Sequence, residues 1–258
     1  MHSTKNNYYT HEPAGRRKMS WLKKALDREL DLQEKTNLKI LDVGCGNGHL
    51  SAYMVHLEYH VTAIDIYEGA IDTAKKLYDT EDISFVHTAL EDVKGEFDVI
   101  TGFEVLEHVD DLNNFLDNIS GHLAPGGSLI ISVPNGWSLE EMIRRVLQHT
   151  FFGNKIKSWL RKTGTLPKSS SQSEADSPHV RFWQYYTWRR ELDKQGFSLL
   201  QVSNVSLFFK QFYYMGWRKF IKPNNILFIT FDRIDNFLVS FLPHFLSDGW
   251  LMVWRKNK

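Results

Sequence analysis

Hydrophobic and polar positions alternate in blocks along the first half of the chain. Short apolar runs of the kind that form buried strands lie at residues 38–43, 60–64, 83–86, 97–101 and 128–133. Apolar residues spaced three or four apart predict helices at residues 48–56, 68–78 and 111–123. Apolar strands that alternate with helices predict a parallel sheet covered on both faces, and right-handed crossovers make it doubly wound.

The pattern is less regular after residue 136. Two further apolar runs, 197–205 and 250–254, bring the predicted sheet to seven strands, and residues 137–148 and 186–195 are typical of helices. The fold class is therefore α/β, with a doubly wound and mostly parallel seven-stranded sheet. An amphipathic N-terminal helix is predicted at residues 19–32.

This pattern divides the chain into three parts. They are an N-terminal arm and helix at 1–36, a regular core at 37–136 and a second half at 137–258. The second half is predicted to contain a flexible Ser-rich loop at 166–178, a helical aromatic insertion at 206–247 and a last strand at 249–255.

Charge separates the two halves, although the formal net charge of the 258-residue chain is zero. Residues 1–135 carry 12 basic and 22 acidic side chains, a charge of −10, and residues 136–258 carry 19 and 9, a charge of +10. The second half also holds 24 of the 35 aromatic residues. The polar N-terminus lacks an apolar signal segment, and the single cysteine excludes an intramolecular disulfide, so a cytoplasmic location is expected.

A glycine-rich turn follows the first strand in the sequence LDVGCGNG, residues 41–48. Such a turn lets a nucleotide-like ligand approach the backbone, and Asp65, 19 residues after Gly46, can accept the ribose hydroxyls. The dinucleotide pattern requires a glycine at position 49, where this chain has His49. Asp42 would repel a pyrophosphate but suits the ammonium group of S-adenosylmethionine, so the turn favours that cofactor over NAD.

Four segments in order resemble those of class I S-adenosylmethionine-dependent methyltransferases. LDVGCGNG resembles the first motif, AIDIYEGAI (63–71) the segment after the second strand, EFDVITGFEVLEHVDD (96–111) the fourth strand and its exit loop, and LAPGGSLIISVPN (123–135) the fifth strand. The resemblance is to small-molecule methyltransferases of the ubiquinone-biosynthesis O-methyltransferase type and the type 11/12 group. It covers residues 38–135 well and 178–203 loosely.

The resemblance implies a set of cofactor contacts with S-adenosylmethionine, which would leave as S-adenosylhomocysteine. The methionine part would face Asp42 and the turn, and the ribose and adenine would lie against the end of the second strand. The contacts implied are those of Asp42, Gly44, Cys45, Gly46, Asp65, Ile66, Asp92, Phe103 and Glu104. Glu91 is the alternative to Asp92, because either register of that segment is compatible with the pattern. For Cys45, packing in the turn is the competing interpretation.

Acceptor-side residues are expected near the exit loop of the fourth strand. His108 in this loop could remove a proton from an acceptor hydroxyl, or could simply hold the loop by hydrogen bonds. His179 and Arg181 follow the Ser-rich loop and could reach the acceptor pocket, and Tyr185 is a further candidate. For Arg181, an ion pair with the acidic core is the alternative. A metal is not predicted.

The aromatic and basic segment 206–245 allows two interpretations. It could form a helical cap whose aromatic side chains pack over the acceptor pocket. It could equally be an interfacial helix that contacts the inner face of a membrane, as a lipid-type acceptor would require. Nucleic acid is not an expected partner, because the chain has an acidic half and no RNA-binding motif. The oligomeric state is left open.

The expected function is methyl transfer from S-adenosylmethionine to a small-molecule or lipid-type acceptor, at a hydroxyl oxygen. Two alternatives stand beside it. One is an NAD(P)-dependent oxidoreductase, against which Asp42 and His49 argue. The other is a non-catalytic S-adenosylmethionine-binding protein on the same scaffold, which an intact glycine turn cannot exclude.

Overall fold

The computed structural model describes residues 14–29, 38–78, 80–138, 181, 183–207, 209, 213, 221–222 and 225–257. Its strands are β1 (Lys39–Val43), β2 (His60–Asp65), β3 (Ile83–His87), β4 (Phe97–Phe103), β5 (Leu123–Pro134), β6 (Phe197–Asn204) and β7 (Gly249–Lys256). Its helices are α1 (Gly15–Glu29), α2 (His49–His56), α3 (Glu68–Leu77), α4 (Leu112–His122), α7 (Tyr185–Lys194) and α9 (Ile226–Val239), with 3-10 turns η4 (Leu90–Asp92) and η6 (His244–Leu246).

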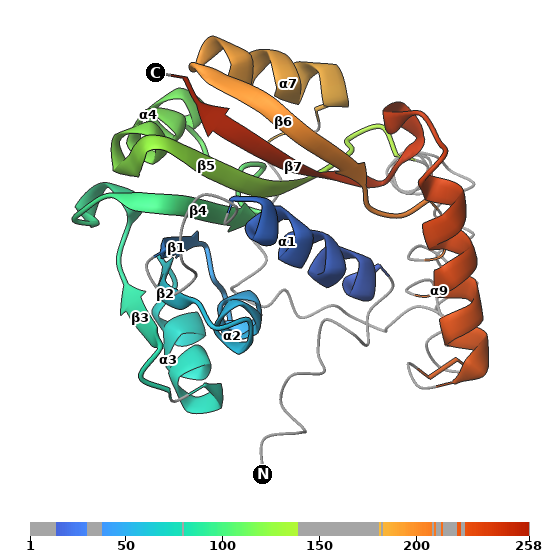
Figure 1. Cartoon of the computed structure of the whole chain (residues 1–258), viewed down its shortest axis with the longest axis horizontal. Helices are drawn as coiled ribbons and strands as arrows, with labels where there is room; N and C mark the ends of the chain where they lie inside the picture. Colours follow the sequence, from blue (N-terminus) through green and yellow to red (C-terminus); the bar gives the residue numbers. More distant parts are fainter. Residues whose placement is uncertain are drawn as a thin grey trace, which may run out of the picture.

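The strands form one seven-stranded sheet in the order β3-β2-β1-β4-β5-β7-β6 (Figure 1). Strands β1 to β5 pair with one another in parallel, and β7 runs antiparallel between β5 and β6. This arrangement confirms the predicted α/β class with a mostly parallel sheet. Since the connections between parallel strands must return the chain, the carboxyl ends of β1, β2, β4 and β5 lie at one edge.

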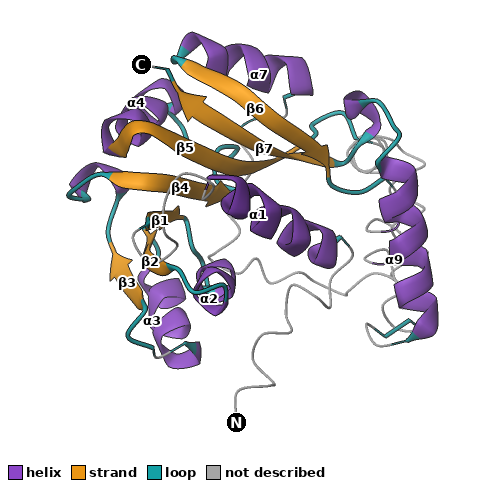
Figure 2. Cartoon of the chain, in the orientation of Figure 1, coloured by secondary structure: helices purple, strands orange, loops and turns teal. Residues whose placement is uncertain are grey.

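Helices cover both faces of the sheet (Figure 2). Successive strand residues point to opposite faces, so Ile40 packs with α1, α2 and α3, whereas Leu41 packs with α4 and α7. Both side chains are almost fully buried. This two-sided burial explains why the central strands β1 and β4 carry near-continuous apolar runs rather than alternating patterns.

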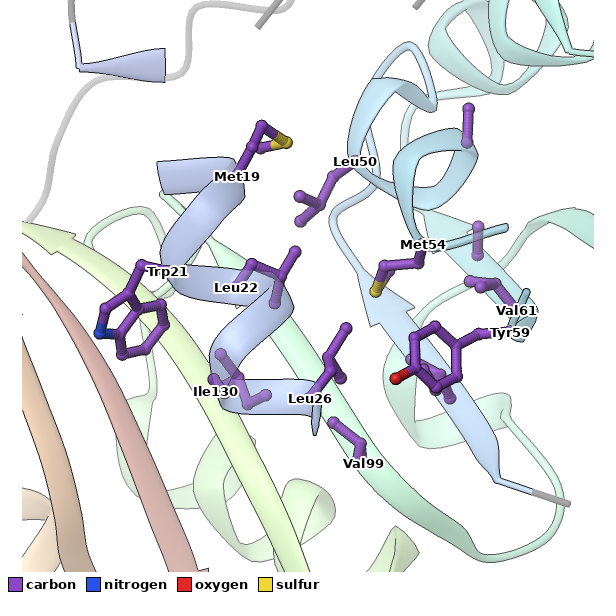
Figure 3. Close-up of a cluster of buried hydrophobic side chains, with 14 of the residues drawn as sticks. Met19, Trp21, Leu22, Leu26, Leu50, Met54, Tyr59, Val61, Val99 and Ile130 are labelled. Carbon is purple, nitrogen blue, oxygen red and sulfur yellow. The ribbon is translucent and has the colours of Figure 1, made fainter. Parts of the chain in front are cut away.

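Helix α1 fills the first face of the sheet. Figure 3 shows Leu22 and Leu26 of α1 between the side chains of α2 and those of Val99 and Ile130 in the central strands. Leu22 and Leu26 have no exposed surface. The amphipathic helix predicted at the N-terminus is therefore part of the main core.

Two elements begin four or five residues earlier than predicted. Helix α1 begins at Gly15 rather than at residue 19, because the Ala14 amide donates to Asp232 Oδ1 at 2.8 Å and so receives a cap from a distant helix. Strand β5 begins at Leu123 rather than at residue 128, because Leu123 pairs with Phe97 before a bulge.

The second half is described in part. The predicted strand at 249–255 corresponds to β7, and α9 forms part of the predicted insertion at 206–247. The helix predicted at 137–148 lies almost entirely outside the described residues, and so does the loop at 166–178. Within the described part of the chain, no helix is long and apolar enough to span a membrane.

We predict that Leu22→Ala lowers the free energy of unfolding by about 2–5 kcal/mol, because it leaves a cavity between α1 and the sheet. Urea denaturation followed by circular dichroism measures this change. The control is Lys24→Ala on the exposed side of α1, for which a change within about 0.5 kcal/mol is expected. Equal effects of the two substitutions would contradict the position of α1 in the core.

Candidate active site

The glycine turn connects β1 to α2, and its three glycines have different structural roles. Gly44, Gly46 and Gly48 all have positive φ angles, of 65°, 51° and 76°. A Cβ atom on Gly44 would lie 2.6 Å from the Val105 side chain, and one on Gly48 would lie 2.6 Å from the Phe85 ring. A Cβ atom on Gly46 would meet no atom of the described residues within 4 Å. The described part of the chain therefore leaves open space at Gly46, as expected where a ligand approaches the backbone.

Asp65 ends β2 and is fixed beside this turn. Its Oδ2 accepts a hydrogen bond from the Gly46 amide at 2.8 Å, and its Oδ1 accepts one from the Tyr67 amide at 2.9 Å. The carboxylate is thus held next to the open space at Gly46, and its contact with the ribose stays a prediction.

Asp42 lies beneath the turn, with 1% of its surface exposed. Its two oxygens accept hydrogen bonds from Ser51 Oγ and Thr101 Oγ1, each at 2.6 Å. Burial raises the pKa of Asp42 to about 6, although both hydroxyl contacts lower it. The described contacts of Asp42 therefore tie β1 to α2 and β4, and its direct contact with the cofactor stays a prediction.

Two candidate adenine contacts are solvent-exposed near Asp65. Ile66 is 78% exposed, an unusual state for an isoleucine that directly follows a buried strand, and it suits a flat apolar ligand. Asp92 and its alternative Glu91 both lie in η4 and are both exposed. Neither register is favoured by the structure.

The Cys45 side chain is partly buried and packs against the core on the α1 side of the sheet. Burial raises the pKa of its thiol, and the carboxylates of Asp42 and Asp65 raise it further. The thiol is therefore protonated at neutral pH, which favours packing over nucleophilic chemistry.

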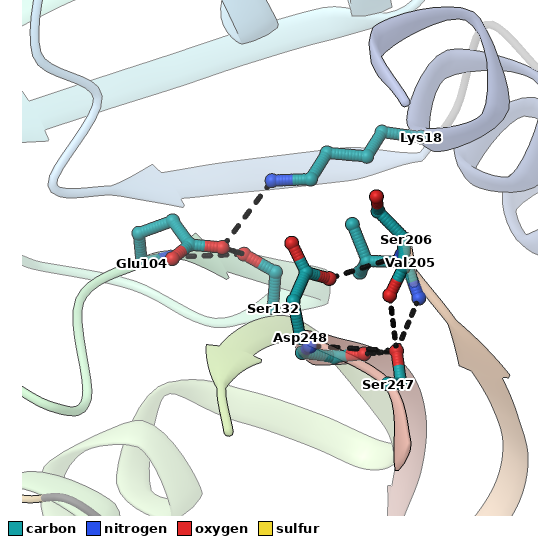
Figure 4. A network of polar contacts seen from close by, with 8 residues as sticks. Lys18, Glu104, Ser132, Val205, Ser206, Ser247 and Asp248 are labelled. Atoms are coloured by element: carbon teal, nitrogen blue, oxygen red, sulfur yellow. Dashed lines mark hydrogen bonds and ion pairs between the residues drawn. The ribbon is translucent and has the colours of Figure 1, made fainter. Parts of the chain in front are cut away.

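Phe103 and Glu104 lie at the carboxyl end of β4, across the turn from Asp65. Glu104 has a positive φ of 56°, and its amide donates to Ser132 Oγ on β5. The Ser132 hydroxyl donates in turn to Glu104 Oε1 at 2.7 Å, and Lys18 of α1 reaches the same oxygen at 3.3 Å (Figure 4). A non-glycine residue in this backbone conformation is strained, so these contacts hold Glu104 in place.

Glu107, three residues further along the exit loop, is fully buried. Among the described residues, neither of its carboxyl oxygens has a hydrogen-bond donor. Burial raises the pKa of Glu107 to about 9, and the neighbouring charge of Glu104 raises it as well. Glu107 was not among the residues predicted from the sequence; two glutamates three residues apart directly after a strand were the available signal.

The acceptor-side candidates are partly brought together. His108 is half-buried in the exit loop, and its amide donates to Val105 O. Arg181 reaches the same loop, since its amide donates to Glu107 O at 3.2 Å and its guanidinium to Asp110 O at 2.7 Å. Its guanidinium also lies over the Trp183 ring, 5.5 Å from the centroid. These described contacts are with carbonyl oxygens and a ring, not with a carboxylate.

The third described acceptor-side candidate, Tyr185, is a core residue. Tyr185 is 5% exposed, and its ring packs against the rings of His244 and Trp250. Packing accounts for this side chain, so its substrate contact stays a prediction. His179 lies outside the described residues.

Comparisons with known proteins place this geometry in a family. A model of the methyltransferase domain matches residues 13–202. The chain belongs to the methyltransferase domain family. The match includes the glycine turn, Asp65 and the exit loop of β4, and confirms the class I S-adenosylmethionine-dependent methyltransferase expected from the four segments.

Curated relatives match over shorter segments. A ubiquinone biosynthesis O-methyltransferase of Rickettsia typhi is 35% identical over 111 residues, covering 42% of this chain and 45% of that protein. A mitochondrial enzyme of the same name from Schizosaccharomyces pombe is 39% identical over 101 residues, covering 36% and 37%. The matched part of the chain thus spans less than half the length of these relatives.

Solved structures share the fold at low sequence identity. A methyltransferase dependent on S-adenosylmethionine from Mesorhizobium loti has a TM-score of 0.55 at 16% identity, covering 92% of this chain and 98% of that one. The 1,6-didemethyltoxoflavin-N1-methyltransferase of Burkholderia thailandensis, solved with S-adenosylhomocysteine, has a TM-score of 0.54 at 17% identity, covering 96% and 80%. The comparisons support S-adenosylmethionine as methyl donor and give no support to an NAD(P)-dependent oxidoreductase or a non-catalytic binding protein.

We predict that Glu107 makes the stability of the fold depend on pH. Because Glu107 keeps its proton to a higher pH in the folded than in the unfolded chain, stability falls as pH rises from 4.5 to about 9. Urea denaturation at several pH values measures this effect. Between about pH 7 and about pH 9, the free energy of unfolding of Glu107→Gln should fall by on the order of 2 kcal/mol less than that of the wild type.

Glu104→Gln is the matched control for this experiment, since the Glu104 side chain is 42% exposed. We expect it to alter the pH dependence of stability less than Glu107→Gln does. A Glu107→Gln variant that loses stability with pH as steeply as the wild type would show that Glu107 is ionised in the folded state.

Proposed function

We propose that this chain transfers the methyl group of S-adenosylmethionine to a hydroxyl oxygen of a small-molecule or lipid-type acceptor. The observation that carries the proposal is the arrangement at one edge of the sheet. The open space at Gly46 and the fixed carboxylate of Asp65 lie at the same edge as the exit loop that carries Glu104, Glu107 and His108. This juxtaposition supports a donor site next to a loop whose side chains could take up the proton of the acceptor.

The residues present fit the donor. Gly46 leaves space for it, Asp65 can accept from its ribose hydroxyls, and the exposed Ile66 offers an apolar surface to the adenine. Bound there, the donor supplies an electrophilic methyl group on a sulfonium. The protein then contributes alignment of the acceptor with that carbon and exclusion of water.

A hydroxyl acceptor also needs a group that removes its proton, and His108 is the side chain we propose for this step. The adjacent Glu107 holds its own proton near neutral pH, because burial raises its pKa. It is therefore a poor base. This leaves the half-buried His108 as the candidate in this loop, and histidine is the side chain that most often acts as a general base.

The proposal that the methyl group goes to an oxygen atom is based on the curated relatives. The proteins from Rickettsia typhi and Schizosaccharomyces pombe are both named as O-methyltransferases of ubiquinone biosynthesis. Since they match less than half of this chain, they support the reaction class more strongly than the acceptor. Within the described residues, no group of three His, Cys, Asp or Glu side chains could hold a metal ion.

We predict that Gly46→Ala weakens the binding of S-adenosylhomocysteine by about tenfold or more, because the new methyl group enters the space reserved for the ligand. Isothermal titration calorimetry measures the affinity. Gly95→Ala is the matched control: Gly95 also has a positive φ, of 99°, and a Cβ atom there would also meet nothing within 4 Å. Both variants should lose about 1–2 kcal/mol of stability, but Gly95→Ala should keep its affinity.

The same calorimetry tests the donor itself. Wild-type protein is expected to bind S-adenosylhomocysteine and not NADH. Tight NADH binding without a response to S-adenosylhomocysteine would overturn the proposed function.

We predict that His108→Gln lowers the rate of methyl transfer by about 100-fold or more while leaving the affinity for S-adenosylhomocysteine within about twofold. The assay follows tritiated methyl groups from S-adenosylmethionine into 3,4-dihydroxybenzoate, with benzylamine as the nitrogen acceptor for comparison. Labelling of benzylamine alone would contradict an oxygen acceptor. An unchanged rate in His108→Gln would leave His108 with a structural role.

A further inference from the structure

The outward side of α9 is apolar. Six side chains of α9 and the turn after it are large, apolar and exposed: Ile226, Leu227, Ile234, Phe237, Leu238 and Phe241. Phe237 is 65% and Phe241 74% exposed, and their rings contact each other. Their spacing of three, four and seven residues puts them on one side of the helix, which we call the outer face of α9. Such a concentration of exposed apolar surface marks an interaction site.

The inner face of α9 carries its two acidic side chains, and both are buried. Asp232 accepts from the Ala14 amide at 2.8 Å. Asp235 accepts from the Ser206 hydroxyl at 2.8 Å and from the Phe209 amide at 3.1 Å. Because the acidic groups of α9 are turned inward, its outer face presents no negative charge.

The exposed charges in the segment that carries this face are positive. Between residues 221 and 246, the described side chains that are both charged and exposed are Lys222 and Arg233. Apolar side chains flanked by basic ones match an anionic lipid surface, where the apolar groups enter the acyl boundary and the cations face the headgroups.

Several contacts fix the orientation of α9. Phe228 on its inner side packs against Phe209 and Tyr213. Arg17 of α1 donates to Asn236 O at 2.8 Å and to Ser240 Oγ at 2.9 Å. Figure 1 shows α9 at the end of the molecule, away from α4 and α3. The apolar side is therefore held outward by the fold.

We propose that the outer face of α9 binds the surface of an anionic lipid bilayer. A second copy of the chain is the competing occupant, but pairing two copies through this face would bring like charges together. A bilayer with anionic headgroups complements both the apolar and the basic side chains. The inference does not depend on the identity of the methyl acceptor.

Vesicle flotation tests the proposal with the full chain. The probes are vesicles of phosphatidylcholine alone and of phosphatidylcholine with about one third phosphatidylglycerol. Wild type should float with the anionic vesicles, and Phe237→Ser/Phe241→Ser should reduce the bound fraction by on the order of tenfold. Arg233→Glu should weaken binding to anionic vesicles and have no effect on neutral ones.

The matched control is Tyr186→Ser/Leu200→Ser, which removes two exposed apolar side chains from α7 and β6. It should float as the wild type does. All variants are first checked for retained binding of S-adenosylhomocysteine, which separates loss of the lipid surface from loss of the fold. Wild type that stays unbound to anionic vesicles overturns the proposal. A different result would assign the outer face of α9 to a second copy of the chain. In that case wild type does not float and sediments as a dimer, whereas Phe237→Ser/Phe241→Ser sediments as a monomer.

Discussion

The hydrogen bond from the Gly46 amide to the Asp65 carboxylate joins the carboxyl ends of β1 and β2, and the candidate site is built around it. The bond requires the Gly46 backbone in a conformation that other residues avoid, and it aims Asp65 at the space that this glycine leaves open. Gly44 and Gly48 serve a different need, since side chains there would collide with Val105 and Phe85. The motif thus combines one open position, at which we propose that the donor binds, with two positions that packing requires to be glycine.

The parts of the fold that depend on local pattern could be predicted from the sequence. The strands follow from apolar runs, and the position of Asp65 at the carboxyl end of β2 follows from them. Its contact with the ribose stays a prediction. Its position needs no knowledge of distant residues. The methyl donor could also be predicted from the local sequence. The carboxylate of Asp42 beside the glycine turn disfavours a pyrophosphate there and suits the ammonium group of S-adenosylmethionine.

Features that depend on distant contacts could not be predicted. Three basic residues, Arg16, Arg17 and Lys18, open α1, where the helix dipole disfavours them, and Ala14 offers no side-chain cap. The cap comes from Asp232 on α9. The burial of Glu107 has a similar origin, because a glutamate in an exit loop is normally solvated and this one is enclosed by segments far away in the sequence, including the one that carries Arg181.

Helix α1 connects the two regions that carry function in these proposals. Lys18 contacts Glu104 at the end of β4, and the neighbouring Arg17 contacts the last turn of α9. Because α1 also fills the core through Leu22, neither contact can shift without disturbing the packing of the sheet. The position and orientation of the outer face of α9 relative to the proposed donor site are therefore fixed. A lipid surface bound by α9 would meet the active site in one orientation, which is a constraint on how a lipid-type acceptor could enter.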